Sequence, residues 1–451
     1  MVFGPDDIPY TPEERVCEAK EGDMYLVLAP ELPNCVSVNA VGRDIIDLCD
    51  GTRTVRDITE LLSSKTGEDP EENLPKILYF LNYLESKKFV FKEPVITPPF
   101  SPKVPDDLSS LWLNVTYACN LRCHHCHSSF GNPLEHELTT EELTHIVKDA
   151  SQFSNCTLII SGGEPLLRKD IDEILKAASH YFGDRVLLIT NGTLINEGKA
   201  QLLADLDIMV QVSLEGPDEE SNDAVRGAGV FKRALNGVRE LRSKGITPIG
   251  RMTLLKTNID RIDEIVEFGR REGFDPVGFG ILQKSGRAFN RIKDMEPTPQ
   301  ELIRAFRKIR EIDPDLEYLR FEESLKPGVM RLEKIDLCSA GTEILSIAPD
   351  GGVYPCSALM YPEFLAGNAM SEPLTKIWKE SPVLQEIRSL SVSKIPGCSE
   401  CPIRYLCGGG CLVDIYWEHK NLQGKTPHCE FLYTIKWEEL KQTRYKIETV
   451  H

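Results

Sequence analysis

The sequence has no long hydrophobic run. None of its segments approaches about 18 uninterrupted apolar residues, the length that a membrane-crossing helix needs, so we expect no membrane-spanning segment. The first residues, MVFGPDDIPYTPEERV, also lack the basic start and the apolar core of a secretory signal. We therefore expect a cytoplasmic protein with no membrane partner.

The sequence also lacks an excess of positive charge. Its 52 Lys and Arg residues are outnumbered by 70 Asp and Glu residues, which gives a formal net charge of −18 at pH 7. Nucleic acids and anionic membranes attract basic surfaces, so this balance argues against both as partners. Hydrophobic residues make up 41% of the 451 residues, which is ordinary for a folded protein and excludes disorder throughout the chain.

Cysteine, by contrast, is abundant. The chain has 14 Cys residues, and stable disulfides are rare in a reducing cytoplasm, so these thiols indicate metal ligands. Three of them lie together at residues 119–126, and seven more lie in the last quarter of the chain. We interpret the remaining four as small core residues: Cys17, Cys35, Cys49 and Cys156.

Residues 1–95 are predicted to form a separate small unit. Its pattern of strands followed by three helices is typical of a winged helix-turn-helix fold. DNA binding is the obvious function for such a fold, but the unit holds 10 Lys and Arg against 19 Asp and Glu residues, a net charge of −9 that repels DNA. The expected strands cover residues 25–29, 35–39 and 89–91, and the expected helices cover residues 40–49 and begin near residues 55 and 70.

A proline-rich linker is expected at residues 96–110, and residues 111–312 then alternate short apolar strands with amphipathic helices. This alternation predicts a parallel sheet in an α/β domain, and six strand–helix units suit a partial (β/α)6 TIM barrel or an open sheet. Residues 313–337 form a bridging region, and residues 338–451 lose the alternation and are expected to be organised by metal. The predicted strands cover residues 111–115, 157–161, 185–190, 208–213, 247–254 and 277–281, and the helices cover residues 140–151, 169–182, 197–203, 231–243, 259–272 and 299–312.

The first cysteine motif follows the first strand of the predicted parallel domain. Cys119, Cys123 and Cys126 have the spacing C-x3-C-x2-C and lie at the carboxyl end of that strand, where the active sites of such folds are built. Three thiolates can hold three irons of a [4Fe–4S] cluster and leave the fourth iron open to a substrate. A zinc site completed by His124, His125 or His127 is the alternative.

This motif and its position resemble the radical S-adenosylmethionine (SAM) superfamily, and further motifs of that family follow in order. The segment Gly162-Gly163-Glu164-Pro165 ends the second predicted strand, and Thr190-Asn191-Gly192 ends the third. Val212-Ser213-Leu214-Glu215-Gly216 ends the fourth, with Glu215 in place of the Asp that the family usually has.

The resemblance assigns roles to these residues. It implies that the backbone of the first motif and Glu164 hold the SAM amino group, and that Ser213 and Glu215 bind the ribose hydroxyls. It also implies that the Arg226 guanidinium pairs with the SAM carboxylate and that His125 packs beside the adenine.

The second group of cysteines resembles the SPASM domain of peptide-modifying radical SAM enzymes. Its order is Cys338-x12-Gly351-x4-Cys356, then Cys398-x2-Cys401-x5-Cys407-x3-Cys411, then Cys429. The resemblance implies two auxiliary [4Fe–4S] clusters. One takes Cys398, Cys401, Cys407 and Cys429, and the other takes Cys338, Cys356 and Cys411.

The second of these ligand sets lacks a fourth cysteine. Several relatives have a further Cys just before the first, but residues 316–336 contain none. One iron would then be open, and a substrate thiolate is one expected ligand because thiolates bind such irons. Water, a glutamate or a histidine are the alternatives.

Residues 25–91 resemble PqqD-like precursor-peptide recognition domains. The matching segments are residues 27–31, Val38-Asn39, residues 50–55 and the closing residues 84–91. The resemblance implies that a leader peptide pairs with an exposed sheet edge and places apolar side chains in a groove beside a helix.

Together these resemblances imply a radical SAM enzyme, of the oxidoreductase type, that modifies a ribosomally made precursor peptide. Its cofactors would be SAM and three [4Fe–4S] clusters, and a 5′-deoxyadenosyl radical would abstract a hydrogen atom from the peptide, with a thioether as the expected cross-link. The expected partners are the peptide with its leader and an electron donor such as flavodoxin or ferredoxin. The alternatives are a tetrapyrrole-modifying enzyme, a sulfatase maturase and, outside the enzymes, an iron–sulfur transcription regulator.

Overall fold

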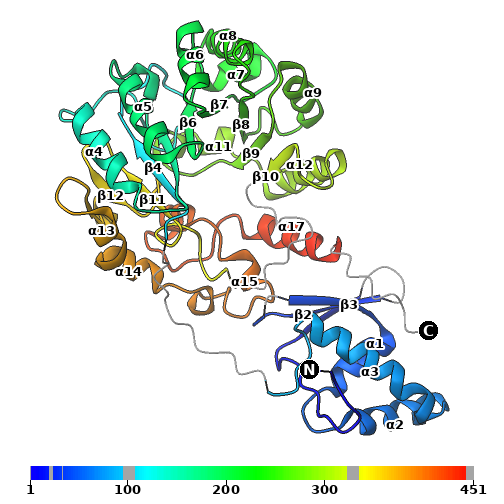
Figure 1. Ribbon diagram of the computed structural model, residues 1–451. Coiled ribbons are helices and arrows are strands. Elements are labelled where there is room, and N and C mark those ends of the chain that lie inside the picture. Colours follow the sequence, from blue (N-terminus) through cyan, green and yellow to red (C-terminus); the bar gives the residue numbers. More distant parts are fainter. Residues whose placement is uncertain (1, 20–23, 33, 95–106, 322–334, 443–451) are drawn as a thin grey trace.

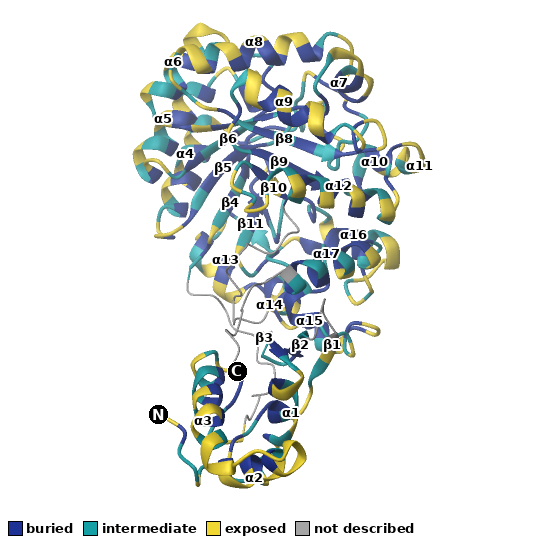
Figure 2. Cartoon of the chain, turned by 90° about the vertical axis from the view of Figure 1, so that its right-hand side faces the viewer, coloured by how far each residue is buried: buried dark blue, intermediate teal, exposed yellow. Residues whose placement is uncertain are grey.

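The computed structural model describes residues 2–19, 24–32, 34–94, 107–321 and 335–442. Figure 1 shows an N-terminal domain at one end of the molecule and a large α/β domain at the other, with the C-terminal helices between them. Figure 2 shows the same arrangement from a second direction. Most of the predicted linker at residues 96–110 and about half of the predicted bridging region at residues 313–337 lie outside the described residues.

The N-terminal domain is a three-stranded antiparallel sheet followed by three helices, which confirms the winged-helix-like prediction. Side chains start each helix: Asn39 accepts the Gly42 N–H, Thr54 forms a capping box with Asp57, and Asp69 caps the third helix. The elements are β1 (Val16–Ala19), β2 (Met24–Ala29), β3 (Asn34–Asn39), α1 (Ala40–Leu48), α2 (Val55–Thr66) and α3 (Pro70–Ser86), with the strand order β1-β2-β3.

Three features of this domain differ from the sequence prediction. The sequence does not predict β1, a short strand at the edge of the sheet. Cys17 lies on this strand and is exposed, so the prediction of a core residue is wrong for Cys17, whereas Cys35, Cys49 and Cys156 are buried as expected. The closing strand expected at residues 89–91 is reduced to one bridge, in which Phe91 and Tyr10 exchange two backbone hydrogen bonds of 2.8 Å.

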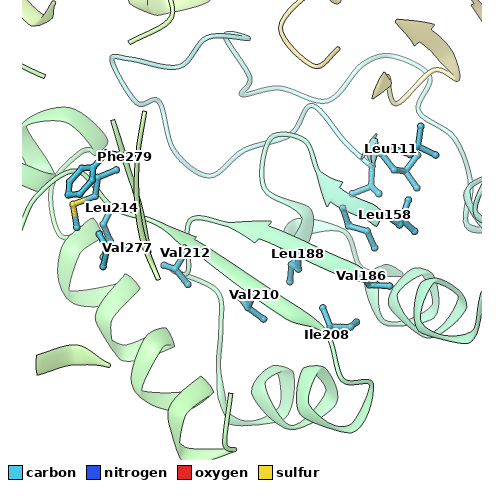
Figure 3. Close-up of a cluster of buried hydrophobic side chains, with 14 of the residues drawn as sticks. Leu111, Leu158, Val186, Leu188, Ile208, Val210, Val212, Leu214, Val277 and Phe279 are labelled. Atoms are coloured by element: carbon cyan, nitrogen blue, oxygen red, sulfur yellow. The ribbon is translucent and has the colours of Figure 1, made fainter. Parts of the chain in front are cut away.

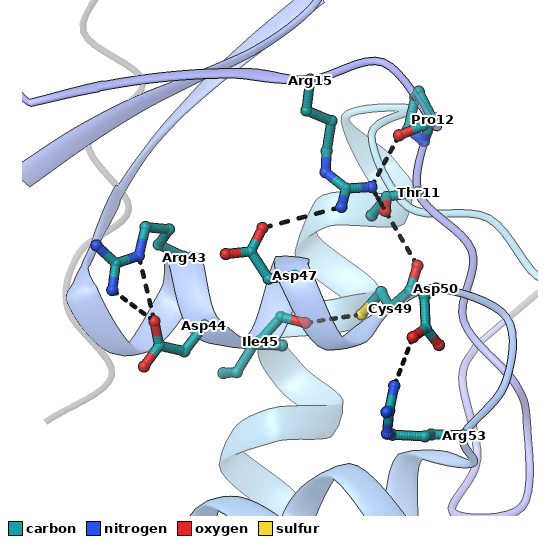
Figure 4. A network of polar contacts seen from close by, with 10 residues as sticks. All are labelled: Thr11, Pro12, Arg15, Arg43, Asp44, Ile45, Asp47, Cys49, Asp50 and Arg53. Atoms are coloured by element: carbon teal, nitrogen blue, oxygen red, sulfur yellow. Dashed lines mark hydrogen bonds and ion pairs between the residues drawn. The ribbon is translucent and has the colours of Figure 1, made fainter.

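A network of polar contacts fastens the first residues to the end of α1 (Figure 4). The Thr11 N–H donates to the Cys49 carbonyl oxygen at 2.8 Å, and Arg15 donates to the Thr11 hydroxyl and lies 3.9 Å from Asp47. The Cys49 thiol donates to the Ile45 carbonyl oxygen at 3.1 Å, and burial raises its pKa to about 12. Cys49 is therefore a protonated, structural thiol.

Six parallel strands in sequence order form the centre of the large domain, with helices on the outside, which confirms the partial (β/α)6 barrel. The strands are β4 (Ser110–Asn114), β5 (Thr157–Ser161), β6 (Val186–Thr190), β7 (Met209–Ser213), β8 (Ile249–Leu254) and β9 (Val277–Ile281). The helices are α4 (Thr140–Ala150), α5 (Ile171–Phe182), α6 (Glu197–Asp205), α7 (Glu219–Arg226), α8 (Val230–Ser243), α9 (Ile262–Glu272), α10 (Gly286–Phe289), α11 (Ile292–Met295) and α12 (Pro299–Ile312), with the 3-10 turn η1 (Pro165–Leu167).

Side chains on the barrel strands alternate between two faces. Leu188, Val210 and Val212 belong to the large apolar core, part of which is shown in Figure 3. Gln211 and Ser213, the alternate residues of β7, line a cavity on the other face of the strands. This period of two is what a strand imposes, and it fixes which residues can reach a ligand inside the barrel.

The sheet continues on both sides of these six strands. β10 (Leu319–Phe321) pairs parallel with β9, and β11 (Ile344–Ile347) pairs parallel with β4. β12 (Gly352–Tyr354) and β13 (Gly367–Asn368) follow antiparallel, which gives ten strands among the described residues. Residues after 338 also contribute Leu345, Trp378 and Phe431 to the core of the barrel, so apolar packing organises this segment as well as any metal.

The rest of the C-terminal segment is helical and is punctuated by turns. Gly408, Gly409 and Gly410 have φ angles of 63°, 78° and 87°, which only glycine adopts without strain in succession. None of the helices in the described part of the chain has the length and apolar character that a membrane crossing needs. The elements are η2 (Pro362–Phe364), α13 (Leu374–Glu380), α14 (Pro382–Arg388), η3 (Val392–Lys394), α15 (Arg404–Cys407), α16 (Leu412–His419) and α17 (Cys429–Gln442).

The N-terminal sheet packs against these C-terminal helices. Arg404, whose side chain is only 3% exposed, donates to Glu14 and, at 2.6 Å, to Glu31 of the N-terminal domain. Around this contact, apolar residues of both parts form one buried cluster: Leu26, Leu28, Cys35, Ile403, Leu406, Trp437 and Leu440. The N-terminal domain is therefore held against the C-terminal helices by an apolar sheet face and by the buried guanidinium of Arg404.

We predict that Arg404→Met loosens this docking, because Glu14 and Glu31 lose a charged donor whose hydrogen bonds stabilise the interface by on the order of 2 kcal/mol. Small-angle scattering should show a larger radius of gyration, and limited proteolysis should separate the N-terminal domain faster. The control is Arg307→Met, which removes the more exposed ion pair of Arg307 with Glu438 on α17. Equal profiles for Arg404→Met and the parent protein would contradict the prediction.

Candidate active site

A cavity of about 430 Å³ opens at the carboxyl ends of the barrel strands. The thiols of Cys119, Cys123 and Cys126 line it, in the loop after β4. Residues of the other motifs line the same cavity: His125, Gly162, Gly163, Ser213, Glu215 and Arg226. Segments more than a hundred residues apart in the sequence therefore meet around one cavity.

The cysteine loop is held by the segment that follows β9. The Arg287 N–H donates to the Cys126 carbonyl oxygen and Arg287 Nε donates to the Cys123 carbonyl oxygen, both at 2.9 Å. Arg287 Nη1 donates to the Phe130 carbonyl oxygen at 2.8 Å. Gly286 has a φ of 56°, and a Cβ there would lie 2.3 Å from the His127 carbonyl oxygen. The sequence alone assigns no role to this Gly-Arg pair, although the pair resembles a loop found in the radical SAM family.

Gly162 and Gly163 allow two backbone segments to touch. A Cβ on Gly162 would lie 2.4 Å from the Thr116 carbonyl oxygen, and a Cβ on Gly163 would lie 2.1 Å from the Ala118 carbonyl oxygen. The Gly163 N–H donates to the Thr116 carbonyl oxygen at 2.8 Å. These glycines therefore join the end of β5 to the residues directly before Cys119, and they also line the cavity.

Glu164 is fully buried and is not among the residues that line the cavity. Its carboxylate accepts hydrogen bonds from the Thr190 hydroxyl at 2.7 Å, from the Asn191 N–H at 2.8 Å and from the Leu166 N–H at 3.2 Å. Pro165, the next residue, is also buried and begins η1. In this structure the Glu164 carboxylate fixes the turn at the end of β6.

Glu215 is 1% exposed and makes two ion pairs. Its Oε1 lies 2.6 Å from Arg226 Nη2 and 2.9 Å from His125 Nε2, and its Oε2 accepts the Thr253 N–H at 2.7 Å. Burial opposes ionisation of this carboxyl, but the charges of His125 and Arg226 outweigh it and lower the pKa of Glu215. Two buried side-chain nitrogens in this group have no hydrogen-bond partner among the described residues, namely His125 Nδ1 and Arg226 Nε.

The C-terminal thiols form two groups. The first group joins Cys398, Cys401, Cys407 and Cys429, in which burial and the neighbouring thiols raise the pKa of each of the first three. The second group joins Cys338, Cys356 and Cys411, which affect one another in the same way. The three consecutive glycines separate Cys407 of the first group from Cys411 of the second. Ser357, directly after Cys356, lines the barrel cavity, so the second group borders the candidate active site.

The three groups of thiols fit iron–sulfur clusters. Burial raises the pKa of Cys119 to about 11 and that of Cys407 to about 12, so cationic iron would have to displace their protons. Among the described residues, no three His, Cys, Asp or Glu side chains are placed to hold one metal ion. A cubane takes one thiolate for each iron, so its ligands need not meet at one metal.

Several residues of the site were not identified from the sequence. Trp112, Asn114, Gln211 and Arg251 line the cavity as members of barrel strands. Counting back in steps of two from the motif residues would have found Gln211 beside Ser213, because alternate side chains share a face. Arg251 could be identified as a site residue only if one knew which strand lies next to β7.

The chain matches three protein families in succession. It matches the PqqD family (coenzyme PQQ synthesis protein D) over residues 25–90, the radical SAM superfamily over residues 113–269 and the SPASM iron–sulfur cluster-binding domain over residues 338–402. These matches agree with the three resemblances drawn from the sequence.

Relatives with known names share the greater part of the chain. The mycofactocin maturase MftC of Mycolicibacterium smegmatis is 32% identical over 324 residues, which cover 70% of this chain and 81% of that protein. The AdoMet-dependent heme synthase of Methanosarcina barkeri is 28% identical over 338 residues, which cover 70% of this chain and 94% of that protein. The solved structure of Streptococcus suis SuiB bound to the precursor peptide SuiA matches with a TM-score of 0.61 and 16% sequence identity. The match covers 93% of this chain and 99% of the SuiB chain, so the two proteins share a fold. The chain therefore belongs to the radical SAM superfamily and carries a SPASM and a PqqD domain.

Proposed function

We propose that this enzyme modifies a ribosomally made precursor peptide at the barrel cavity. The observation that carries the proposal is the meeting of three thiols with Ser213, Glu215 and Arg226 around one cavity. The relatives support it, since MftC is named a maturase and SuiB is bound to a precursor peptide. That the bond formed is a thioether stays a prediction.

In this proposal Cys119, Cys123 and Cys126 hold a [4Fe–4S] cluster and the cavity holds SAM. When bound, this pair supplies the 5′-deoxyadenosyl radical that removes a hydrogen atom from the substrate. The chain's own residues bind and orient SAM. Arg226 Nε, a buried donor without a partner among the described residues, would pair with the SAM carboxylate. The Ser213 hydroxyl would bind the ribose.

Two motif carboxylates would act indirectly. Glu215 is already bonded to Arg226, His125 and the Thr253 N–H, so it would orient Arg226 toward the SAM carboxylate and His125 toward the adenine, besides any contact of its own with the ribose. Glu164 would hold the turn after β6 while the backbone of Gly162 and Gly163 meets the SAM amino group. Both are positioning residues.

The two C-terminal groups of thiols would hold auxiliary [4Fe–4S] clusters. The four thiols of Cys398, Cys401, Cys407 and Cys429 suffice for a fully ligated cube. The group of Cys338, Cys356 and Cys411 would hold the other cluster beside the cavity. When bound there, that cluster would supply an electron acceptor at the edge of the cavity that Ser357 lines.

A groove on the N-terminal domain suits the leader peptide. It has a volume of about 380 Å³ and is lined by apolar residues, among them Val38, Val41, Ile77 and Phe80, together with charged residues such as Lys65. Strand β3 lies at the edge of the sheet, so an extended peptide can pair with it beside the groove. The other face of the sheet is covered by the C-terminal helices.

A tetrapyrrole is the second candidate substrate, because the Methanosarcina barkeri relative is named a heme synthase. The groove beside β3 would then have no role, which favours the peptide. Formylglycine formation by a sulfatase maturase needs no such groove either. A transcription regulator would need a basic face on the N-terminal unit, whose net charge is −9.

We further propose that flavodoxin or ferredoxin supplies the reducing electron and that the enzyme works in the cytoplasm. All 14 Cys residues lie in the described part of the chain, and none forms a disulfide. Ten thiols committed to clusters need a compartment that keeps them reduced.

Replacing Cys119, Cys123 and Cys126 together with Ala should abolish formation of 5′-deoxyadenosine from SAM, because no thiolate remains for the cluster that cleaves it. Both auxiliary clusters should persist, with about eight irons per chain. The control is Cys17→Ala, which changes an exposed thiol outside all three groups. If the triple variant still produced 5′-deoxyadenosine at the parent rate, the triad would not be the SAM site.

Anaerobic reconstitution of the parent protein should give three [4Fe–4S] clusters, about twelve irons per chain, since three separate groups of thiols are present. Iron and acid-labile sulfide analysis measures this directly. A value near four irons per chain would remove both auxiliary clusters from the account.

Replacing Val41 with Glu should weaken leader binding on the order of tenfold or more, because a carboxylate is then buried against an apolar peptide face. Val41 lines the groove and is 56% exposed. The matched control is Tyr79→Glu on α3, since Tyr79 is 67% exposed and does not line the groove. Titration of a fluorescent precursor peptide encoded by a neighbouring reading frame measures the affinity, and equal effects of both variants would exclude the groove as the leader site.

A further inference from the structure

The group of Cys338, Cys356 and Cys411 has no fourth thiol within its reach. The Cys residues outside the three groups are Cys17, Cys35 and Cys49 in the N-terminal domain and Cys156 directly before β5. Cys156 belongs to the apolar core at the amino end of the barrel, away from the cavity mouth. A four-iron cluster on this group therefore needs a ligand that is not cysteine.

A buried carboxylate lies beside the third thiol of the group. Asp414 follows Cys411 by three residues, in the first turn of α16, and is 3% exposed. Cys411 is the N-cap residue of α16, and a spacing of three residues at the start of a helix brings its side chain close to that of Asp414. The first turn of a helix thus brings a carboxylate to the same buried place as the thiols.

Among the residues that the structure describes, a backbone N–H holds Asp414 in place, but no cation forms a hydrogen bond with its carboxylate. Its Oδ1 accepts the Lys284 N–H at 3.2 Å, whereas the Lys284 ammonium lies 2.9 Å from Glu296. Its Oδ2 lies 3.7 Å from His428 Nε2, which is too long for a hydrogen bond. A buried carboxylate is costly unless a cation or a metal compensates it, and iron would do so here.

We propose that Asp414 is the fourth protein ligand of the cluster on Cys338, Cys356 and Cys411. The inference rests on the proposed ligand set, and it closes the iron that the sequence leaves open to a substrate thiolate. With this ligand in place, the cluster would have no open iron for the peptide sulfur, which would leave it an electron-transfer or a structural role. Carboxylate oxygen is an acceptable ligand for iron, although a harder one than thiolate.

His428 is the rival ligand from the chain. It is 6% exposed and its Nε2 has no hydrogen-bond partner among the described residues. It directly precedes Cys429 of the other group, however, whereas Asp414 lies in the first turn of the helix that Cys411 begins. A His428→Ala variant separates the two candidates.

The test uses the full chain with Cys119, Cys123 and Cys126 replaced by Ala, so that only the auxiliary clusters contribute. Three variants are made on this background: Asp414→Ala, Asp414→Cys and His428→Ala. Iron content, Mössbauer spectra and electron paramagnetic resonance after mild oxidation are recorded with and without 2-mercaptoethanol, which stands in for a peptide thiol. Asp414→Cys supplies a thiolate at the same position and guards against loss of the fold.

We expect the background protein to hold about eight irons, and we expect its spectra not to change when 2-mercaptoethanol is added. Asp414→Ala should yield one three-iron cluster on oxidation, with about seven irons, and its remaining cluster should respond to 2-mercaptoethanol. Asp414→Cys should keep about eight irons with altered spectra, and His428→Ala should match the background. The proposal is overturned if the background protein itself binds the thiol at this cluster, or if His428→Ala opens the cluster while Asp414→Ala does not. A background protein with only about four irons would instead refute the proposed ligand set.

Discussion

In a parallel sheet, neighbouring strands end at the same edge, and this register is the constraint on which the site depends. The loop after β4 carries the three cysteines, the turn after β5 carries the two glycines, and the residues after β7 carry Glu215. Because side chains alternate along each strand, Ser213 and Glu215 face the cavity while Leu214 between them is fully buried in the core. A slip of one residue in β7 would exchange these faces.

The C-terminal segment connects this cavity to the N-terminal domain. It extends the barrel sheet through β11, borders the cavity at Ser357 and covers the outer face of the N-terminal sheet around Arg404. Cys401 and Cys407 also pack against that covered face. One group of thiols therefore borders the cavity, and the other borders the N-terminal domain.

Much of this architecture could be predicted from the sequence because the signals are local. The six barrel strands are short apolar runs that end in turns, and cysteine spacings within a motif need no knowledge of the fold. β1 was missed because Val16–Ala19 is a four-residue edge strand with an exposed side, and β10 to β13 were missed because two to four residues carry no clear period.

The rest depends on contacts between distant residues. Glu215 forms ion pairs with His125 and Arg226 only once the chain has folded. The same holds for the hydrogen bonds of Arg287 to the cysteine loop and for the position of Asp414 beside Cys411. Motif comparison named Glu164 as a ligand contact, but its bonds to Thr190 and Asn191 are visible only in three dimensions. Residue type and spacing thus identify the class of cofactor. The hydrogen bonds and ion pairs within the fold decide which side chains can touch a ligand.

The central claim is that the cavity removes a hydrogen atom from a peptide. The most direct measurement supplies the reconstituted enzyme with SAM, a reductant and a precursor peptide whose non-exchangeable positions carry deuterium. Mass spectrometry then follows both 5′-deoxyadenosine and the peptide. The account predicts one deuterium in the 5′-deoxyadenosine and a matching mass change in the peptide. Unlabelled 5′-deoxyadenosine together with an unchanged peptide would contradict it.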